Sequence, residues 1–194
     1  MTAAARKDEV RRSLRDGRRT RNGGSDEAAR IAEHVLDLEE VRSACESGAP
    51  IACYASRAEE PPTDELIARL RDAGATVLLP RVEGNDLAWI ETDPSTSFTS
   101  NSLGINEPEG LASDVQPALW IIPALAVDAD GYRLGQGGGF YDRTLAGLPD
   151  DGRGPIIAVV FEEEAVPEVP REGHDHRVDV VVTPERVRWL SMPD

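Results

Sequence analysis

The sequence has few cysteines and no long apolar run. Of its 194 residues only two are cysteine, Cys45 and Cys53, and they do not form a C-x-x-C pair. That scarcity argues against a disulfide framework, a zinc ribbon and a redox motif, and it is typical of a reducing cytoplasm. No apolar segment approaches the roughly 20 residues that span a bilayer. The charged N-terminal segment lacks the apolar stretch of a signal peptide, so we expect a cytoplasmic protein without a membrane partner.

Basic residues are also scarce, and they are unevenly placed. The chain has 21 Lys and Arg against 36 Asp and Glu, a net charge of −15, so it should repel nucleic-acid phosphates and have no nucleic-acid partner. Residues 1–22 are the exception, with eight basic and three acidic side chains. Two explanations remain open for this segment: a solvated helix that docks on an acidic domain, or one half of an anion site.

Lysine occurs once, as Lys7. An ammonium group on a flexible stem suits phosphate oxygens, so Lys7 is a candidate phosphate ligand, with chance as the alternative explanation. In a helix over residues 3–21, Lys7, Arg11 and Arg15 would line one face because they recur every four residues. The acidic run at residues 162–164, in contrast, is expected to be solvated.

Helical periods alternate with short β-branched runs along the chain. This pattern predicts one layered α/β domain over residues 1–194, with a mainly parallel sheet flanked by helices. Helices are expected at residues 3–21, 26–46, 61–73 and 139–146, and strands at residues 50–55, 77–80, 86–91, 119–122, 156–161 and 178–183. Residues 92–116 lack a period and are expected to form a long surface segment. In such a domain the functional site lies at the carboxyl ends of the strands.

The most informative segment is DADGYRLGQGGGFYDR, from Asp128 to Arg143. Its glycines allow left-handed backbone and the close approach of a ligand, and successive N–H groups in such a loop can bind an anion. Arg133 and Arg143 add positive charge, and Asp142 offers a carboxylate for a metal. The segment is neither a Walker A loop nor a G-x-G-x-x-G motif, and a flexible connection is the alternative explanation.

RLGQGGGFYDR closely resembles the signature of the 5-formyltetrahydrofolate cyclo-ligase family, also called methenyltetrahydrofolate synthetases. Further motifs of that family follow in the right order across about residues 6–183: K-x-x-[LV]-R at Lys7–Arg11, E-x-x-T at Glu60 and Thr63, L-P-R at residues 79–81, G-I-x-E-P at residues 104–108, and V-P-x-x-x-x-D-x-x-V-D from Val169. The sequence departs from the family pattern at Ala124, Val127, Gln136 and Phe140.

The resemblance implies an enzyme that converts 5-formyltetrahydrofolate and ATP to 5,10-methenyltetrahydrofolate, ADP and phosphate, with magnesium as the metal. The γ-phosphoryl group would pass to the formyl oxygen and make it a good leaving group, so no protein nucleophile is needed. We expect a monomer whose partners are small molecules, the reduced folate and ATP.

The resemblance also implies roles for individual residues. The ATP-binding set is Lys7, Arg11, Arg133, Leu134, Gly135, Gln136, Gly137, Gly138, Gly139, Phe140 and Tyr141, with Arg15 as a weaker candidate. The folate-binding set is Ala55, Glu60, Leu103 and Phe140. The magnesium ligands are Asp142 and Asp175, and the catalytic residues are Arg133, Tyr141 and Asp142.

Two other functions remain open at this point. One is a phosphate- or folate-binding member of the same fold without turnover, which would have little need of a basic helix opposite the glycine-rich loop. The other is a sugar-phosphate enzyme with a similar layered fold, which would not depend on ATP.

Overall fold

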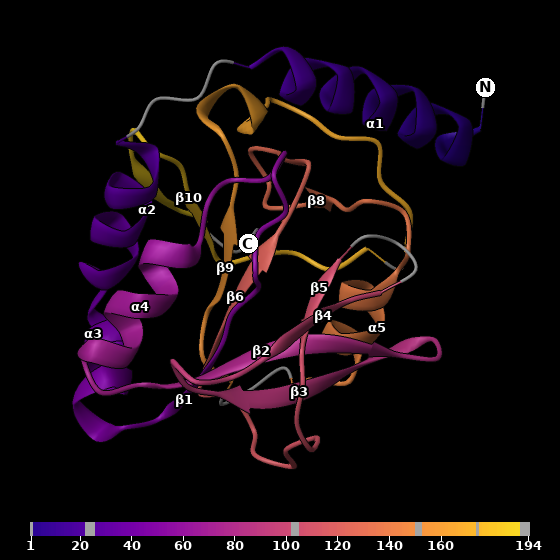
Figure 1. The fold of residues 1–194 in the computed structure, drawn as a ribbon. Coiled ribbons are helices and arrows are strands. Elements are labelled where there is room, and N and C mark those ends of the chain that lie inside the picture. The colour runs from indigo at the N-terminus through magenta and orange to yellow at the C-terminus, as the bar shows by residue number, and fades with distance from the viewer. Residues whose placement is uncertain (1, 22–25, 102–104, 150–152, 174, 191–194) are drawn as a thin grey trace.

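A seven-stranded sheet runs through the centre of the molecule in the computed structural model, which describes residues 2–21, 26–101, 105–149, 153–173 and 175–190 (Figure 1). Its five inner strands are parallel, in the order β10 (Val180–Val182), β9 (Ile156–Val159), β6 (Leu119–Pro123), β1 (Pro50–Ala52) and β2 (Thr76–Glu83). The edge strands β11 (Val187–Trp189) and β3 (Asp86–Thr92) are antiparallel to their neighbours. The expected α/β fold with a mainly parallel sheet is confirmed.

The inner strands are apolar because both faces of the sheet are covered. Successive residues of β6 alternate between the two sides: Ile121 packs in the core under one helical layer, whereas Trp120 and Ile122 pack in the core on the opposite face. The same alternation places Ile157 on the first face and Ile156 on the second. The continuous apolar runs of the sequence therefore correspond to strands buried on both sides.

Three helices cover the first face of the sheet: α2 (Glu27–Leu36), α3 (Glu39–Ser47) and α4 (Asp64–Asp72). The prediction of one helix over residues 26–46 was wrong, because the chain breaks between α2 and α3. Leu38 adopts an extended conformation with φ −68° and ψ 130° and is buried in the core. The extended backbone at Leu38, the N-cap of α3, separates the two helices although the side chain stays in the core.

The second face is covered in part by α5 (Phe140–Ala146), whose Leu145 packs into the core beside β6 and β9. The segment before α5 contains a short antiparallel pair that the sequence analysis missed, β7 (Ala126–Val127) and β8 (Arg133–Leu134). A 3₁₀ turn, η1 (Glu162–Glu164), follows β9.

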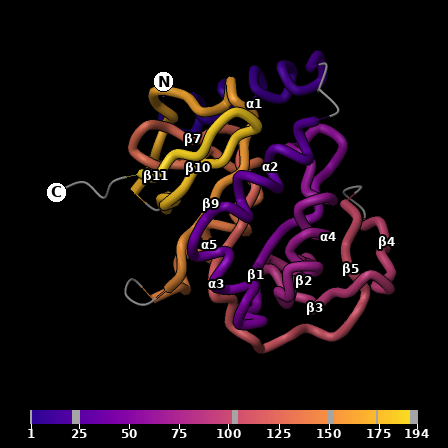
Figure 2. The backbone as a smooth tube through the Cα atoms, turned by 90° about the vertical axis from the view of Figure 1, so that its left-hand side faces the viewer, coloured from indigo at the N-terminus to yellow at the C-terminus, as the bar shows by residue number. Residues whose placement is uncertain are grey.

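The helix α1 (Ala3–Thr20) lies across the carboxyl ends of the parallel strands, at the top of Figure 1 and Figure 2. Val10 and Leu14 pack against a small core that includes Ala126 and Leu134 of the β7–β8 pair. The helix is capped by Thr2, whose hydroxyl accepts a hydrogen bond from the Ala5 N–H at 3.3 Å. The predicted basic helix is thus present, and its apolar stripe faces the body of the protein.

The segment at residues 92–116 is more ordered than predicted. It contains β4 (Phe98–Ser100) and β5 (Asn106–Pro108), which pair antiparallel beside the main sheet. This pair and β11 lie on opposite sides of the molecule (Figure 2). Within the described ranges, no helix combines the length and the apolar character needed to traverse a membrane.

The strand order reverses at β1. From β1 the chain passes through α4 to β2 on one side, and it returns later to form β6 on the other side. In open α/β sheets, ligands bind in the crevice outside the carboxyl ends of the strands at such a reversal. The topology therefore points to the ends of β1 and β6, under α1, as the place to look for a site.

Candidate active site

The glycine-rich loop, residues 135–139, connects β8 to α5 and contains two left-handed residues. Gly137 has φ +103° and Gly139 has φ +68°, a region that side chains disfavour. A Cβ atom at Gly139 would lie 2.6 Å from Nη1 of Arg143. At these two positions the backbone conformation favours glycine, whereas the contact at Gly139 involves only the movable end of Arg143.

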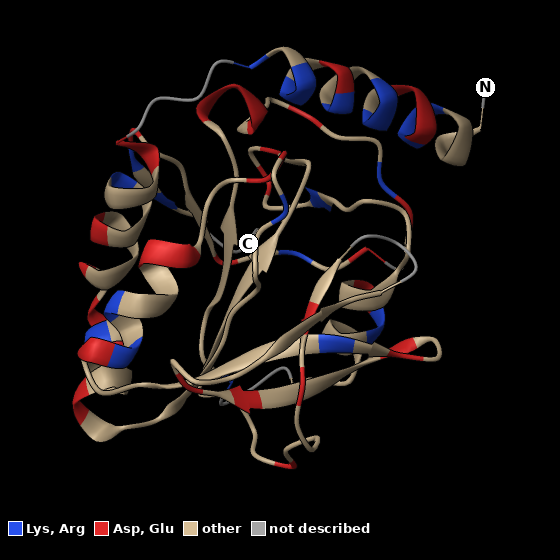
Figure 3. Cartoon of the chain, viewed as in Figure 1, with Lys and Arg blue, Asp and Glu red and all other residues tan. Residues whose placement is uncertain are grey.

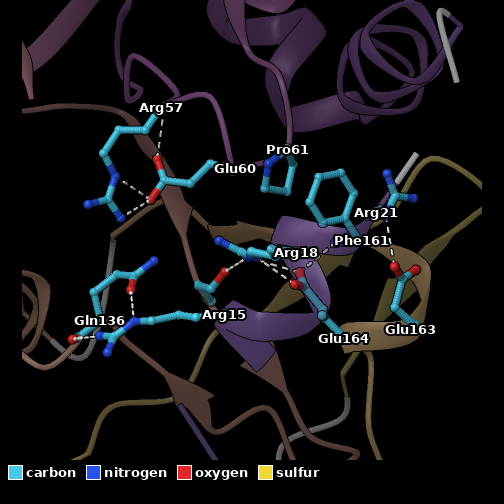
Figure 4. A network of polar contacts seen from close by, with 12 residues as sticks. Arg15, Arg18, Arg21, Arg57, Glu60, Pro61, Gln136, Phe161, Glu163 and Glu164 are labelled. Atoms are coloured by element: carbon cyan, nitrogen blue, oxygen red, sulfur yellow. Dashed lines mark hydrogen bonds and ion pairs between the residues drawn. The ribbon is translucent and has the colours of Figure 1, made fainter. Parts of the chain in front are cut away.

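The basic helix α1 contacts this loop directly. Arg11 donates from Nε to the carbonyl oxygen of Gly135 at 2.9 Å. Arg15 donates to Gln136 twice, from Nε to the amide oxygen at 3.1 Å and from Nη2 to the carbonyl oxygen at 2.6 Å (Figure 4). Three hydrogen bonds between segments more than 120 residues apart in sequence therefore set the position of the loop under α1.

Arg143 braces the loop from its other side. Its Nε donates to the carbonyl oxygen of Asn85 at 2.8 Å, and its Nη2 donates to the carbonyl oxygen of Gly138 at 3.2 Å. Asn85 lies in the turn between β2 and β3. Arg143, expected from the sequence to add positive charge, thus ties the loop to the tip of the β2–β3 hairpin.

Arg133 is almost completely buried, with 2% of its side chain exposed. Its Nη2 donates to Oδ1 of Asp142 at 2.6 Å, and its guanidinium carbon lies 5.9 Å from the centre of the Tyr141 ring. Burial lowers the pKa of Arg133 although the charge of Asp142 opposes this shift. Among the described residues its Nε has no hydrogen-bond partner. A buried donor without a partner costs free energy, so this nitrogen is a natural contact for a ligand.

Lys7 is also buried, with 6% of its side chain exposed. Its Nζ donates to the two carboxylate oxygens of Asp175 at 2.8 and 2.6 Å and lies 3.0 Å from Oε2 of Glu172. Burial lowers the pKa of Lys7, but the hydrogen bonds to Asp175 and Glu172 outweigh burial and raise it. The side chain of Lys7 is therefore buried against Asp175, a residue 168 positions later in the sequence. It does not lie on a solvated helix face.

The two predicted metal ligands pair with two of the predicted phosphate ligands. Asp142 is bound by Arg133, and Asp175 is bound by Lys7; the charge of Asp175 also acts on the pKa of Arg133. The described residues include no group of three or more His, Cys, Asp and Glu arranged to hold a metal ion. Two carboxylates paired with buried cations, Asp142 and Asp175, have the chemistry that Mg²⁺ accepts, since this ion binds through one or two carboxylates and keeps several waters.

Glu60 lies close to the same group. It is 8% exposed, and Arg57 donates to its carboxylate from the main-chain N–H at 3.1 Å and from Nη2 at 2.6 Å. The pKa of Tyr141 is raised, mainly by burial and next by the negative charge of Glu60. The pKa of Tyr54 is raised by the same two causes, and burial is again the larger one. Glu60 is therefore a buried carboxylate paired with Arg57 and not a solvated acidic residue.

The structure thus brings together Lys7, Arg11, the loop with Phe140, Arg133, Tyr141, Asp142, Asp175 and Glu60 at one end of the sheet. Ala55 follows β1 at the same end and packs half-buried against the core. Leu103 lies outside the described residues. The positions agree with one site, whereas the roles of the individual residues stay predictions.

Arg18 is a member of this region that the sequence analysis did not single out. Its guanidinium donates to the two carboxylate oxygens of Glu164 at 2.6 and 2.9 Å and to the carbonyl oxygen of Ala124 at 2.6 Å (Figure 4). The side chains of Arg18 and Glu164 are 2% and 3% exposed, so the prediction that Glu164 is solvated was wrong. Arg18 lies four residues beyond Leu14, on the inward face of α1, and this spacing could have revealed it.

Two of the weaker sequence motifs are neighbours in space. Arg81 donates from Nη1 to the carbonyl oxygen of Gly110 at 2.7 Å, and Glu107 accepts from the Val82 N–H at 2.9 Å. Between them lies a depression of about 330 Å³ bordered by β2 and the β4–β5 pair. The L-P-R and G-I-x-E-P motifs therefore shape one surface.

The strand reversal, the glycine-rich loop and the basic helix above it place the chain among doubly wound α/β proteins with their site at the carboxyl edge of the sheet. Residues 3–184 match the 5-formyltetrahydrofolate cyclo-ligase family as a whole. The chain belongs to this family, and the resemblance noted from the motifs is confirmed.

Individual relatives agree with this assignment. The chain is 37% identical over 151 residues to a 5-formyltetrahydrofolate cyclo-ligase of Mycolicibacterium smegmatis. The matched segment covers 72% of this chain and 76% of the relative. It is 34% identical over 144 residues to the Escherichia coli protein of the same name, covering 71% and 79%. Because both relatives are named as ligases of this family, the expected enzyme class is confirmed.

The fold has solved counterparts. The structure of Aquifex aeolicus 5,10-methenyltetrahydrofolate synthetase superposes with a TM-score of 0.74 at 29% identity, over 97% of this chain and 94% of that chain. A synthetase of the same name from Mycoplasma pneumoniae gives a TM-score of 0.70 at 19% identity, over 92% and 98%, which supports the fold alone.

Proposed function

We propose that the protein catalyses the ATP-dependent cyclisation of 5-formyltetrahydrofolate to 5,10-methenyltetrahydrofolate, with release of ADP and phosphate. The observation that carries the proposal is the opposition of α1 and the glycine-rich loop. Arg11 and Lys7 come from α1, and the buried Arg133 comes from β8; among the described residues its Nε has no hydrogen-bond partner. Membership of the family supports the choice of substrates.

The reaction needs activation of a poor electrophile. The formyl oxygen attacks the γ-phosphorus, and ADP leaves. The N10 amine of the folate then attacks the activated formyl carbon and loses its proton. The C–O bond breaks, and phosphate departs with the former formyl oxygen. Phosphoryl transfer of this kind depends on positioning and on stabilisation of charge, so a set of fixed cations is the main requirement.

Two ion pairs compensate the buried cations of this site. Arg133 is paired with the carboxylate of Asp142, and Lys7 with that of Asp175. In our proposal, the phosphates take the place of these carboxylates as partners of the two cations. Asp142 and Asp175 would then hold Mg²⁺, which supplies neutralisation of phosphate charge when bound.

Glu60 provides an acceptor for the folate. Its buried carboxylate lies close enough to Tyr141 for its charge to act on that hydroxyl, and it would accept hydrogen bonds from the N–H groups of the pterin ring. Tyr141 also lies beside Arg133, so it borders the proposed phosphate and folate positions together. Ala55, Leu103 and Phe140 are proposed to line the pocket, and the enzyme to be a cytoplasmic monomer.

The test is formation of methenyltetrahydrofolate, followed by its near-ultraviolet absorbance. We expect turnover that needs ATP and a divalent cation, and that stops on chelation or when AMP replaces ATP. Undiminished turnover without ATP would exclude the phosphoryl-transfer mechanism and favour a different enzyme of similar fold. Binding of folate and ATP without product would instead identify a non-catalytic member of the family.

A further inference from the structure

Asp128 is a buried carboxylate that has no part in the reaction described above. It is 1% exposed and follows β7 directly, at the start of the turn that leads into β8. In the described part of the chain its two carboxylate oxygens accept hydrogen bonds from main-chain N–H groups and form no ion pair. Burial of a carboxylate without a cation is costly, so a neutral side chain would be expected here unless the second oxygen is needed.

One oxygen of Asp128 closes the turn between β7 and β8. Oδ1 accepts from the N–H groups of Asp130 at 3.0 Å and of Tyr132 at 2.9 Å. The main-chain N–H of Asp128 donates to the carbonyl oxygen of Tyr132 at 3.0 Å. Arg133 is the next residue and the first of β8, so the turn sets the position of the main chain that carries this buried guanidinium group.

The other oxygen of Asp128 reaches a different segment. Oδ2 accepts from the N–H of Val169 at 3.3 Å. Val169 belongs to the η1–β10 segment, of which residues 165–173 and 175–179 are described. This segment carries both acidic and basic positions as it passes beneath α1 (Figure 3). Asp175 lies on it and accepts hydrogen bonds from Lys7 of α1.

The contact with Val169 explains why residue 128 is an acid. A carboxylate accepts on both oxygens, whereas an amide accepts on one atom and donates from the other. Asparagine closes turns of this kind as well as aspartate does. Because two hydrogen bonds hold the turn and one reaches Val169, an asparagine should keep the turn and direct an N–H group at the N–H of Val169. Only the acid joins the turn to the η1–β10 segment.

The two segments that Asp128 joins supply two neighbouring charges of the proposed ATP site. Burial lowers the pKa of Arg133, and the charge of Asp175 is among the influences that oppose this shift, so the two groups lie close together. The η1–β10 segment is attached to the turn a second time, where the N–H of Val178 donates to the carbonyl oxygen of Gly131 at 2.9 Å. Asp175 thus lies between two points of attachment to the turn that precedes Arg133.

We propose that Asp128 is a positioning residue of the ATP site, which fixes Arg133 and Asp175 relative to each other through the two oxygens of one carboxylate. The inference rests on the proposed function, which assigns phosphate to Arg133 and magnesium to Asp175. Asp128 itself would touch neither. Glu60, which is assigned to the folate, lies on the connection between β1 and α4 and is held by Arg57, so it does not depend on this turn.

The experiment measures two equilibria in the wild-type protein and in Asp128→Asn: binding of ATP with magnesium but without folate, and binding of 5-formyltetrahydrofolate without ATP. We expect the dissociation constant for ATP to rise about five- to tenfold, the scale of one lost hydrogen bond to a charged acceptor. The constant for the folate should change by less than about twofold. A residue that only stabilises the fold would not separate the two ligands.

Asp130→Asn is the matched control. Asp130 lies in the same turn, and its ion pair with Arg171 at 2.9 Å joins the turn to the same η1–β10 segment. Both side chains of this pair are exposed, and exposed ion pairs contribute little. Asp130→Asn should therefore change neither dissociation constant.

Hydrogen exchange gives a readout that needs no ligand. In Asp128→Asn the amides of residues 166–173 should exchange faster, while those of Asp130 and Tyr132 stay protected because the turn is kept. Asp128→Ala removes both oxygens and should expose the turn as well. Exchange in β1 and β9, at the centre of the sheet, should be the same in all these proteins.

Each result decides between the alternatives. A loss of affinity for ATP alone, with faster exchange confined to the η1–β10 segment, supports the inference. Unchanged affinity for ATP, or equal losses for ATP and the folate, overturns it and leaves the proposed function intact. Faster exchange throughout the sheet, or an Asp128→Asn protein that does not fold, also overturns it and assigns Asp128 to stability. If the wild-type protein binds no ATP, the proposed function itself fails, and the inference fails with it.

Discussion

Arg133 and Asp142 form an ion pair of 2.6 Å between a guanidinium group that is 2% exposed and a carboxylate that is 27% exposed. Arg133 is proposed to bind the phosphates of ATP, and Asp142 is proposed to bind the magnesium ion. Phosphate and magnesium carry opposite charges and would be bound together as one complex. Lys7 and Asp175 repeat the arrangement at 2.6 Å. Each pair therefore joins one proposed phosphate ligand to one proposed magnesium ligand.

Arg133→Lys tests the buried guanidinium. A lysine keeps the charge but has neither the fork that reaches Asp142 nor an Nε donor, so kcat/KM should fall about 10- to 100-fold, the effect of one or two lost charge-assisted hydrogen bonds. Steady-state kinetics with ATP as the varied substrate measures the change. Arg153→Lys, which alters a half-exposed ion pair with Asp179, is the matched control. Equal kinetics in the two variants would remove Arg133 from the site.

Lys7→Ala tests the single lysine. Its ammonium is proposed to meet phosphate oxygens only, so the Michaelis constant for ATP should rise far more than that for folate, corresponding to about 1.5–3 kcal/mol. Kinetics with each substrate varied in turn separates the two effects. Arg6→Ala removes one positive charge from an exposed position of the same helix and should change neither constant. A parallel rise in both constants would indicate that Lys7 has a structural role through Asp175.

Gly137→Val tests the loop. The left-handed backbone at Gly137, with φ +103°, is a poor conformation for a β-branched residue, so the loop should distort and turnover should be lost. We expect the variant to remain folded and to lose the rise in melting temperature that ATP causes in the parent protein. Gly17→Ala is the control, because a Cβ at Gly17 meets no atom within 4 Å and the residue lies in a helix. A Gly137→Val protein that keeps both turnover and the ATP-dependent shift would mean that the loop does not form the phosphate site.

Arg18→Ala tests the link between α1 and the sheet. The change leaves the carboxylate of Glu164 buried and without its guanidinium partner, which should reduce the free energy of unfolding by about 3–5 kcal/mol. The double variant Arg18→Met with Glu164→Leu should recover part of that loss, because it removes both buried charges. Urea unfolding followed by circular dichroism measures the three free energies. A single variant as stable as the parent would show that the pair does not anchor α1.

The family could be predicted because the signal of its glycine-rich motif is local. The glycine-rich motif requires particular backbone conformations within a few residues, and Gly137 and Gly139 adopt them. The five parallel strands correspond to five apolar runs, because strands covered on both faces need no polar alternation. The β7–β8 pair was missed since each strand has two residues, too few to show a period.

The break between α2 and α3 and the burial of Glu164 could not be predicted, because both depend on what packs against them. Leu38, the extended N-cap of α3, packs in a core that also includes residues of β6, β9 and β10. Glu164 belongs to a run of three acidic residues that reads as solvated, and it is buried because Arg18 reaches it from a helix 146 residues earlier.

By itself, then, the sequence determined the five parallel strands of the sheet, the loop that needs glycine, and the family. Tertiary structure alone decided which charges meet. Lys7 pairs with Asp175, which lies 168 residues later in the sequence. Arg15 donates a hydrogen bond to the neutral side chain of Gln136, which lies 121 residues later. Backbone conformation follows from neighbouring residues, whereas a charge finds its partner only after the sheet has brought distant segments to one edge.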